Sequence, residues 1–173
     1  NPFMALNQAF FFEATVVWIP SSLLVDKPID ILHISKGEKL CSHAKTLLFI
    51  DQGANANVNE VTFASDSQEC LTTSAIEVFL GKEAQLNLTK AYAGNLTSFH
   101  FSKVSATLEQ QAQLNHFGFS TSGNVVRHEV QAVLKEPEAE IHLSGVFLGN
   151  DSASVTNHVC VEHQASRTMS QQI

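Results

Sequence analysis

Histidine, cysteine and acidic side chains gather near the end of the chain, where together they could bind a metal ion. His158, Cys160 and His163 lie close to one another in sequence, with Glu162 among them. Imidazole and thiolate groups are ligands that zinc and iron favour. On one β-strand, however, His158 and Cys160 share a face and His163 lies on the other, so all three can bind one ion only if the strand bends. We therefore favour an exposed polar strand over a metal or cluster site, and contact of His158 or Cys160 with iron stays an open alternative.

The chain carries none of the short motifs that mark common catalytic sites. It has no G-x-S-x-G nucleophile elbow, no Walker phosphate loop, no H-E-x-x-H zinc motif and no Asp-rich calcium repeat. Its acidic residues Glu136, Glu138 and Glu140 flank Pro137 and are typical of a solvated turn. We predict no catalytic, cofactor-binding or metal-ligating residue in this chain, and no enzymatic activity.

Four short segments echo one another and predict the architecture that positions these side chains. They begin at Ala56, Ala84, Ala112 and Ala139 and read Ala-Asn-Val-Asn, Ala-Gln-Leu-Asn, Ala-Gln-Leu-Asn and Ala-Glu-Ile-His. The sequence numbers of successive alanines differ by 84 − 56 = 28, 112 − 84 = 28 and 139 − 112 = 27. A period of roughly 20 to 50 residues is typical of a solenoid, in which each unit buries its apolar face by stacking on its neighbours.

Alternation within each repeat predicts β-strands. Apolar side chains follow each alanine at every second position, as Leu86 and Leu88 follow Ala84. A second strand-like stretch comes about half a repeat later, at residues 45–50, 75–80, 98–104, 125–133 and 155–161. Strands that recur once per coil stack in parallel about 4.8 Å apart. We therefore predict an all-β parallel β-helix, a solenoid of about five coils with two main strands per coil and the 27–28 period of the alanines.

The two ends of the chain differ from the repeats. Residues 2–10 are expected to form a short helix or loop, and Ile29 and Ile31 match Ala56 and Val58 at a spacing of 27. These boundaries predict a lead-in segment at 1–27 and a β-helix core at 28–173. The chain stops where another coil should begin, so the core is expected to be truncated at its C-terminal end. Its unpaired strand edges invite self-association through the open end.

The repeat also predicts where individual polar side chains point. His116 continues the alternation of Ala112 and Leu114, so we expect an inward-facing, hydrogen-bonded core histidine. His100 and His128 are one repeat apart, a spacing that would stack them in adjacent coils. Arg127 would need a buried partner if its strand turned it inward.

Composition and charge exclude several classes of partner. The chain is 44% hydrophobic and 16% charged, with a net charge of −7, which disfavours nucleic acid and anionic membrane surfaces. It has no stretch of about 18 or more apolar residues that could span a membrane. The three cysteines, Cys41, Cys70 and Cys160, form no C-x-x-C pair, and their odd number gives no closed disulfide framework. A reducing compartment, the cytoplasm, is the simpler interpretation.

Several segments, taken in order, resemble the SufB/SufD family of iron–sulfur cluster assembly scaffold proteins. The N-terminal ones are Phe-Met-Ala-Leu-Asn-Gln-Ala-Phe-Phe at 3–11, Val-Val-Trp-Ile-Pro at 16–20 and Lys-Pro-Ile at 27–29. The later ones lie at 123–127, at 139–148 and at the pairs Asn157-His158 and Glu162-His163. The similarity spans essentially all 173 residues. One departure is Glu13-Ala14-Thr15, where an Asp-Gly turn is common in the family.

The resemblance implies a non-catalytic scaffold subunit of the SUF system with a right-handed parallel β-helix. In that family a SufB-like subunit, a SufD-like subunit and the ABC-type ATPase SufC assemble into one complex. The few, scattered cysteines offer no evident persulfide acceptor, which favours a SufD-like member. The family's ATPase-binding helices and its Asp-Asp-x-x-Cys-x-His-Gly segment have no counterpart before Ile173. The resemblance thus implies that the paralogue, the ATPase and an iron–sulfur cluster are bound only in the full-length complex, with this stretch as its rigid spine.

Two other classes of parallel β-helix protein remain as alternatives. A carbohydrate-active enzyme would carry clustered acidic residues on successive coils, which this chain lacks, and it would cleave a polysaccharide. A purely structural or adhesive solenoid of a secreted protein would have a signal peptide encoded upstream of Asn1. Neighbouring genes for a SufC-like ATPase and a desulfurase would dismiss the adhesive alternative.

Overall fold

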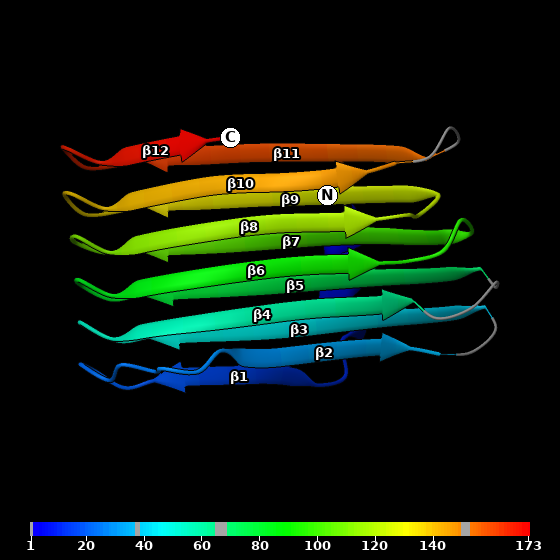
Figure 1. Cartoon of the computed structure of the whole chain (residues 1–173), viewed down its shortest axis with the longest axis horizontal. Coiled ribbons are helices and arrows are strands. Elements are labelled where there is room, and N and C mark those ends of the chain that lie inside the picture. Colours follow the sequence, from blue (N-terminus) through cyan, green and yellow to red (C-terminus); the bar gives the residue numbers. More distant parts are fainter. Residues whose placement is uncertain (1, 37–38, 65–68, 150–152) are drawn as a thin grey trace.

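The chain folds into a parallel β-solenoid of about five turns with one short N-terminal helix (Figure 1). The computed structural model describes residues 2–36, 39–64, 69–149 and 153–173. The elements are α1 (Pro2–Phe10), β1 (Ala14–Ile19), β2 (Ile29–Ser35), β3 (Leu40–Ile50), β4 (Asn55–Ala64), β5 (Cys70–Leu80), β6 (Gln85–Ala93), β7 (Ser98–Leu108), β8 (Gln113–Thr121), β9 (Val125–Leu134), β10 (Glu140–Leu148), β11 (Ser154–His163) and β12 (Met169–Gln172). The predicted fold class is confirmed, and residues 2–10 form a helix.

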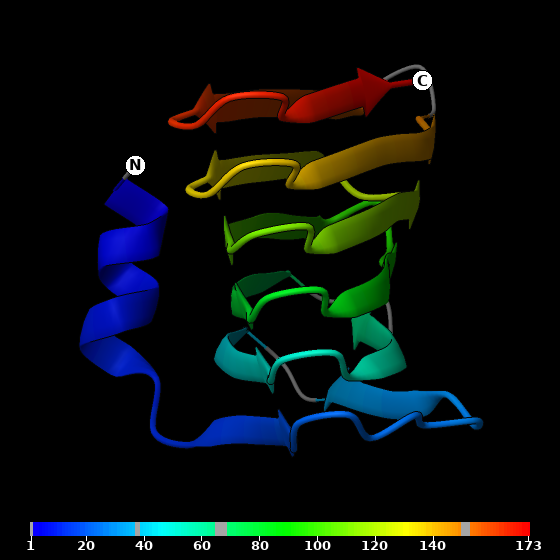
Figure 2. The ribbon, with the colours of Figure 1, turned by 90° about the vertical axis from the view of Figure 1, so that its left-hand side faces the viewer.

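Two six-stranded sheets face each other across the interior (Figure 2). Sheet A has the order β1-β3-β5-β7-β9-β11, and sheet B has the order β2-β4-β6-β8-β10-β12. All neighbouring strands are parallel. Each coil therefore contributes one strand to each sheet, as the sequence predicts, and β1 joins sheet A from within the lead-in segment.

The strand register corrects the first member of the predicted alanine series. Asn55 pairs with Gln85, so Ala54 rather than Ala56 is equivalent to Ala84, and Ala56 lies beside Leu86. The first residues of β4 and β5 differ in number by 70 − 55 = 15, whereas those of β6 and β7 differ by 98 − 85 = 13. The coil that begins with β4 is therefore two residues longer than the alanine motif predicts. The error arose because Ala54 and Ala56 both point inward, so the motif matches equally well after a slip of two residues.

The same displacement affects the first coil. Ile29 pairs with Val58, at a spacing of 58 − 29 = 29, and not with Ala56 at a spacing of 27. Ile31 consequently lies beside Glu60 rather than beside Val58. The predicted strand at 29–31 is present, but its register was wrong by two residues.

A tight corner joins sheet A to sheet B in every coil. The residue before each corner position has a left-handed φ: Ser22 62°, Gly53 64°, Glu83 59°, Gln111 56°, Glu138 64° and Arg167 57°. The corner residue then closes a short turn, as where Ala84 donates its N–H to the carbonyl of Gly81 over 3.1 Å. The corner column Ala54, Ala84, Ala112 and Ala139 is completely buried, with 0% exposure. Alanine fits there because larger side chains would collide between coils.

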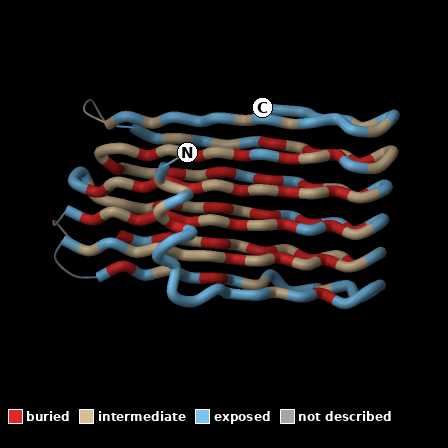
Figure 3. Tube along the Cα trace, turned by 180° about the vertical axis from the view of Figure 1, so that it is seen from behind, coloured by how far each residue is buried: buried red, intermediate tan, exposed pale blue. Residues whose placement is uncertain are grey.

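An aliphatic core fills the half of the interior next to these corners, and Figure 3 shows that buried residues of either kind gather in the middle coils. Its columns include Leu48, Ile76 and Val78 from sheet A and Leu86, Leu114 and Ile141 from sheet B, each almost fully buried. In the last coil, by contrast, every residue of β12 is exposed and β11 is only partly buried. The tightly packed interior therefore lies in the middle coils.

The outer surfaces of the two sheets differ. Helix α1 packs on the outside of sheet A, over β3, β5 and β7 (Figure 2). The buried amide of Asn7 donates to the carbonyl oxygen of Ala44 at 2.9 Å and to the hydroxyl of Thr73 at 2.9 Å, and Phe3 stacks on Phe101. Sheet B carries an exposed amide ladder, in which Asn115 donates to Asn87 at 2.8 Å and Asn87 to Asn57 at 2.7 Å.

Candidate functional site

The half of the interior away from the corners is polar, and this polar column is the candidate functional site. In sheet A the inward positions of successive coils are Ser74, Ser102, His128 and Asn157. In sheet B the facing positions are Glu60, Lys90, Gly118 and Gly145. Because strand alternation turns these residues inward, the stack places ionisable groups from different coils next to one another.

Glu60 of β4 is the centre of a buried ionic cluster. Its carboxylate accepts from Lys90 Nζ at 2.5 Å, from Ser74 Oγ at 2.7 Å and from Thr46 Oγ1 at 2.7 Å. Lys90 also contacts Ser74 Oγ at 2.7 Å, and His33 Nε2 lies 3.5 Å from the carboxylate. The Glu60 and Lys90 side chains are 1% and 2% exposed, so both charges are removed from water. Such a pair is tolerated only because each charge has a partner.

Burial and pairing act on the Glu60 pKa in opposite directions. Burial alone would raise the pKa, but the Lys90 ammonium, the nearby His33 imidazole and the hydrogen bonds from Lys90 and Thr46 together hold it far below its usual range. Glu60 is therefore a carboxylate at neutral pH and can act neither as a proton donor nor as a neutral carboxylic acid.

A second polar group lies between β5, β6 and β7. His100, with 0% exposure, has its Nδ1 hydrogen-bonded to Thr72 Oγ1 at 2.7 Å, and its ring stacks on Tyr92 with centroids 4.0 Å apart. Tyr92 donates its hydroxyl to Ser98 Oγ at 2.7 Å. Burial, together with His128 and Lys90, lowers the pKa of His100 well below its usual value. The imidazole is therefore neutral at physiological pH.

His116 and His128 continue the polar column towards the last coils. His116 donates Nδ1–H to the carbonyl oxygen of Leu88 at 3.1 Å, which assigns the proton to that nitrogen because a carbonyl only accepts. His128 Nδ1 lies 2.5 Å from Ser102 Oγ. Burial is the main cause that lowers the pKa of His116 to about 4 and that of His128 to about 3, and Lys90 adds to both shifts.

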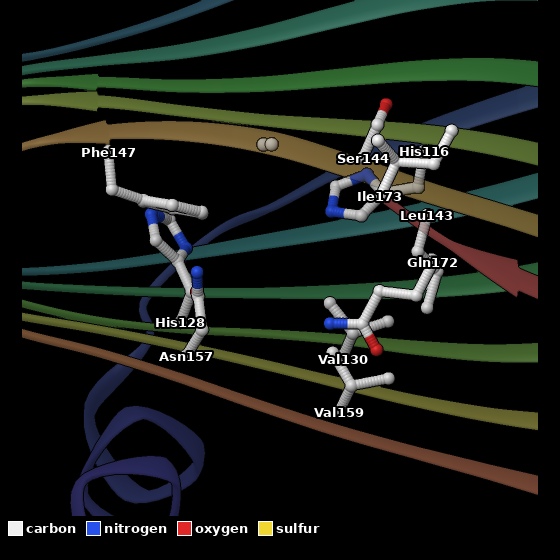
Figure 4. A pocket seen from close by; sticks show the side chains of 12 residues that line it. His116, His128, Val130, Leu143, Ser144, Phe147, Asn157, Val159, Gln172 and Ile173 are labelled. Atoms are coloured by element: carbon white, nitrogen blue, oxygen red, sulfur yellow. The ribbon is translucent and has the colours of Figure 1, made fainter.

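A cavity of about 230 Å³ opens beside these two histidines (Figure 4). His116 and His128 line it together with Phe147, Asn157 and the C-terminal Ile173. Figure 4 shows the His128 ring next to Phe147 and Asn157, with His116 on the other side of the cavity. A Cβ on Gly145 would lie 2.8 Å from the Phe147 ring, so glycine is required for Phe147 to form this wall.

The residues that the sequence singled out for metal binding do not come together. His158, Cys160 and His163 all lie on β11 and are exposed. His163 is paired beside the core residue Leu134 and contacts Thr168 Oγ1 at 2.7 Å and Ser170 Oγ at 3.0 Å. Among the residues that the structure describes, no group of three or more His, Cys, Asp or Glu side chains could hold a metal ion.

The structure also tests the predicted positions of four other polar side chains. His116 points inward and is hydrogen-bonded, as predicted. His100 and His128 lie in adjacent coils, as their spacing predicts, but they are not directly opposite each other, because His100 pairs with Val126 at a spacing of 126 − 100 = 26. The two rings are nevertheless neighbours, with centroids 5.8 Å apart at 66°. Arg127 lies on the outer face of sheet A and is half-buried, and within the described ranges its Nε has no hydrogen-bond partner.

The strand alternation, and not a short motif, indicates the ionic cluster in the sequence. Glu60 follows the inward residues Ala56 and Val58 in strict alternation, and Lys90 follows Leu86 and Leu88 in the same way. A charged residue in the inward phase of two neighbouring coils indicates a buried pair, because a single buried charge is costly.

The arrangement can supply fixed charge and neutral imidazoles, held inside a rigid stack. The fold and the polar interior define the class of protein, a parallel β-solenoid whose core is part aliphatic and part ionisable. The described residues contain no helix long and apolar enough to cross a membrane.

Comparison with known proteins identifies the family. Residues 33–173 match the family model described as the SUF system FeS cluster assembly, SufBD core domain. This range covers every strand from β3 to β12, and the chain therefore belongs to the SufBD family of iron–sulfur cluster assembly proteins.

Curated relatives bear the same family name. The chain is 27% identical over 90 residues to iron-sulfur cluster assembly SufBD family proteins of Staphylococcus saprophyticus and Staphylococcus epidermidis, and 26% identical to one of Staphylococcus haemolyticus. In each case the match covers 51% of this chain and 19% of the relative. The matched region is thus about a fifth of the length of these relatives.

Proposed function

We propose that the chain is the structural β-helix core of a non-catalytic scaffold subunit of the SUF iron–sulfur cluster assembly complex. The observation that carries the proposal is the match to the SufBD core domain over nearly the whole solenoid. The stack of two parallel sheets around a fixed ionic cluster suits a rigid spine that holds binding segments in place.

The proposal assigns the partners to the full-length protein in the cytoplasm. There a paralogous SufB-like or SufD-like subunit and a SufC-type ATPase bind segments outside residues 1–173. The iron–sulfur cluster is the cargo of that complex and has no ligand in this stretch.

A pull-down from cell extract under anaerobic conditions tests the proposal. The full-length protein is the bait, and residues 1–173 alone are the matched control. We expect the full-length protein to recover an ATPase and a paralogous β-helix subunit, and the control to recover neither. Recovery of both partners by the control would place their contacts within the solenoid, and recovery of neither by the full-length bait would contradict membership in the complex.

Genetic complementation distinguishes a SufD-like from a SufB-like subunit. The SufD-like assignment predicts that the full-length gene restores iron–sulfur enzyme activity in a strain lacking the SufD-like paralogue, but not in a strain lacking the SufB-like one. The small number of cysteines supports the assignment: Cys41 and the buried Cys70 lie on the neighbouring strands β3 and β5, and Cys160 lies on β11. The opposite pattern of rescue would reverse it.

Self-association is a separate part of the proposal. Strands β11 and β12 at one end, and β1 and β2 at the other, each pair with a single neighbour in their sheets. Such edges can accept a strand from a second copy. Light scattering of residues 1–173 over a range of concentrations should show a dimer or larger species, and a monomer at every concentration would contradict this part.

A further inference from the structure

His128 lies at the boundary between the closed polar column and the cavity beside the last coils. It is only 7% exposed. Its Nδ1 is bonded to Ser102, whereas its Nε2 is buried with no hydrogen-bond partner in the part of the chain that the structure describes. The cavity of about 230 Å³ adjoins it, bounded by Phe147 and Asn157 (Figure 4). The ring thus has an unsatisfied polar atom and space next to it.

The groups packed around His128 do not accommodate a positive charge. The Lys90 ammonium on β6 and the imidazole of His116 on β8 both disfavour a positive charge on His128. From β7 it meets Ser102 and the His100 ring at 5.8 Å, and from β10 the Phe147 ring at 5.5 Å. Asn157 of β11 is a neutral neighbour. The carboxylate in this interior, Glu60, is already neutralised by Lys90.

We propose that His128 is a proton-operated gate that opens the last coils of the solenoid, β9 to β12, when the surrounding solution becomes acidic. In the closed form the imidazole is neutral and held by Ser102. In the open form β9 separates locally from β7, and the protonated ring turns into the cavity and reaches water. The inference does not depend on the proposed function, since it rests only on the packing around His128.

The direction follows from proton linkage. The pKa of His128 is lowered to about 3 in the closed form, whereas an exposed histidine titrates near about 6.5. Between these two values the open form binds a proton that the closed form does not, so acid favours opening. Each histidine released in this way multiplies the opening constant by roughly eightfold between about pH 6 and pH 5. His116, with a pKa lowered to about 4, adds a similar factor if β8 opens as well.

Hydrogen exchange of the full-length protein tests the gate. Opening constants for amides of β9 and β11 are measured between pH 7 and pH 5, after correction for the intrinsic exchange rate. We expect the wild-type constant to rise about eightfold more between pH 6 and pH 5 than that of His128→Gln. The matched control, His142→Gln, changes a half-exposed histidine on the outside of β10 and should leave the pH dependence unchanged.

Two results would overturn the proposal. The first is the same pH dependence of opening in the wild type and in His128→Gln. The second is a nitrogen-15 titration of the wild-type imidazoles in which His128 takes up a proton near pH 6 without any loss of amide protection in β9. The second measurement needs no variant, so the gate can be refuted even if His128→Gln fails to fold.

Discussion

Replacing Lys90 by methionine should expose the energetic role of the interior ionic cluster. Methionine keeps the length of the aliphatic stem and removes only the ammonium that lies 2.5 Å from Glu60. The carboxylate would keep its two hydroxyl donors, Ser74 and Thr46, at 2.7 Å each. It would lose the ammonium, whose positive charge compensates for the removal of the carboxylate from water. Lys90→Met therefore converts a compensated pair into a single buried charge.

The expected cost is large because Glu60 is only 1% exposed. Removing one partner of a buried ion pair typically costs about 3–5 kcal/mol of the free energy of unfolding. In a domain of this size each kcal/mol lowers the melting temperature by roughly 2–4 °C, so a fall of roughly 6–20 °C is expected.

A double-mutant cycle measured by urea denaturation isolates the pair. The variants are Lys90→Met, Glu60→Gln and the combination of the two, in which the glutamine oxygen can accept from one of the hydroxyls of Ser74 and Thr46 and the glutamine NH2 can donate to the other. We expect the double variant to be more stable than the sum of the single losses implies, by about 2–3 kcal/mol. The control is Lys82→Met, because Lys82 and Glu136 form an exposed pair at 3.8 Å and such pairs contribute only about 0–1 kcal/mol.

The pH dependence of the loss gives a second check. In the wild type the pKa of Glu60 is lowered, so its contribution to stability is present at neutral pH and is lost as the pH falls. In Lys90→Met the burial of Glu60 is no longer opposed by the ammonium, so the pKa of Glu60 rises and acid relieves the buried charge. The difference between wild type and variant should therefore shrink on acidification. A loss below about 1 kcal/mol that does not vary with pH would refute the reasoning.

Three further predictions concern other parts of the fold. Ala112→Leu should cost about 1–3 kcal/mol in urea denaturation by overfilling the corner column, while Gln113→Leu at the next position should cost less. Asn7→Ala removes the hydrogen bonds that fix α1 to β3 and β5, so hydrogen exchange should show loss of protection in α1 but not in β6; protection of both would contradict the docking. The neutral histidines His100, His116 and His128 have lowered pKa values, so their contribution to the free energy of unfolding is fully present above about pH 6.5 and is lost as the pH falls. For His116 and His128 we expect a loss of about 1 kcal/mol each between about pH 6 and pH 5 in urea denaturation, and a constant free energy of unfolding would argue against their burial as neutral groups.

The sequence was sufficient to predict the solenoid because two periods coincide in it. Alternation every second residue marks the strands, and the alanines at 84, 112 and 139 mark the corners. The strand ends were less visible. The predicted strand at 45–50 begins at Leu40 in the structure, because outward residues such as His43 are covered by neighbouring strands and the helix rather than by apolar neighbours in sequence.

The polar interior could not be predicted with the same ease. Short sequence motifs consist of residues that are close in sequence. Glu60 and Lys90 are a full coil apart, and they meet only because the strand register pairs them. His158, Cys160 and His163 show the converse, since they are close in sequence but distributed over an exposed strand. Proximity within a solenoid is determined by the coil length, so an error of two residues in the period conceals a contact.

That error also suggests what the ion pair does for the fold. Sliding β4 by two residues would place Ala56 beside Ala84 and Val58 beside Leu86, and every inward residue would still point inward. The aliphatic columns therefore discriminate poorly between the two registers. The slipped register, however, would place Glu60 beside Leu88 and Lys90 beside Thr62, and would move the two charges from directly paired to diagonal positions. Because a buried ion pair offsets its desolvation only with good geometry, the poorer diagonal contact would disfavour the shorter coil that the alanine motif alone favours. We therefore infer that Glu60 and Lys90 favour the longer coil, a role in which buried polar groups add specificity of structure rather than stability.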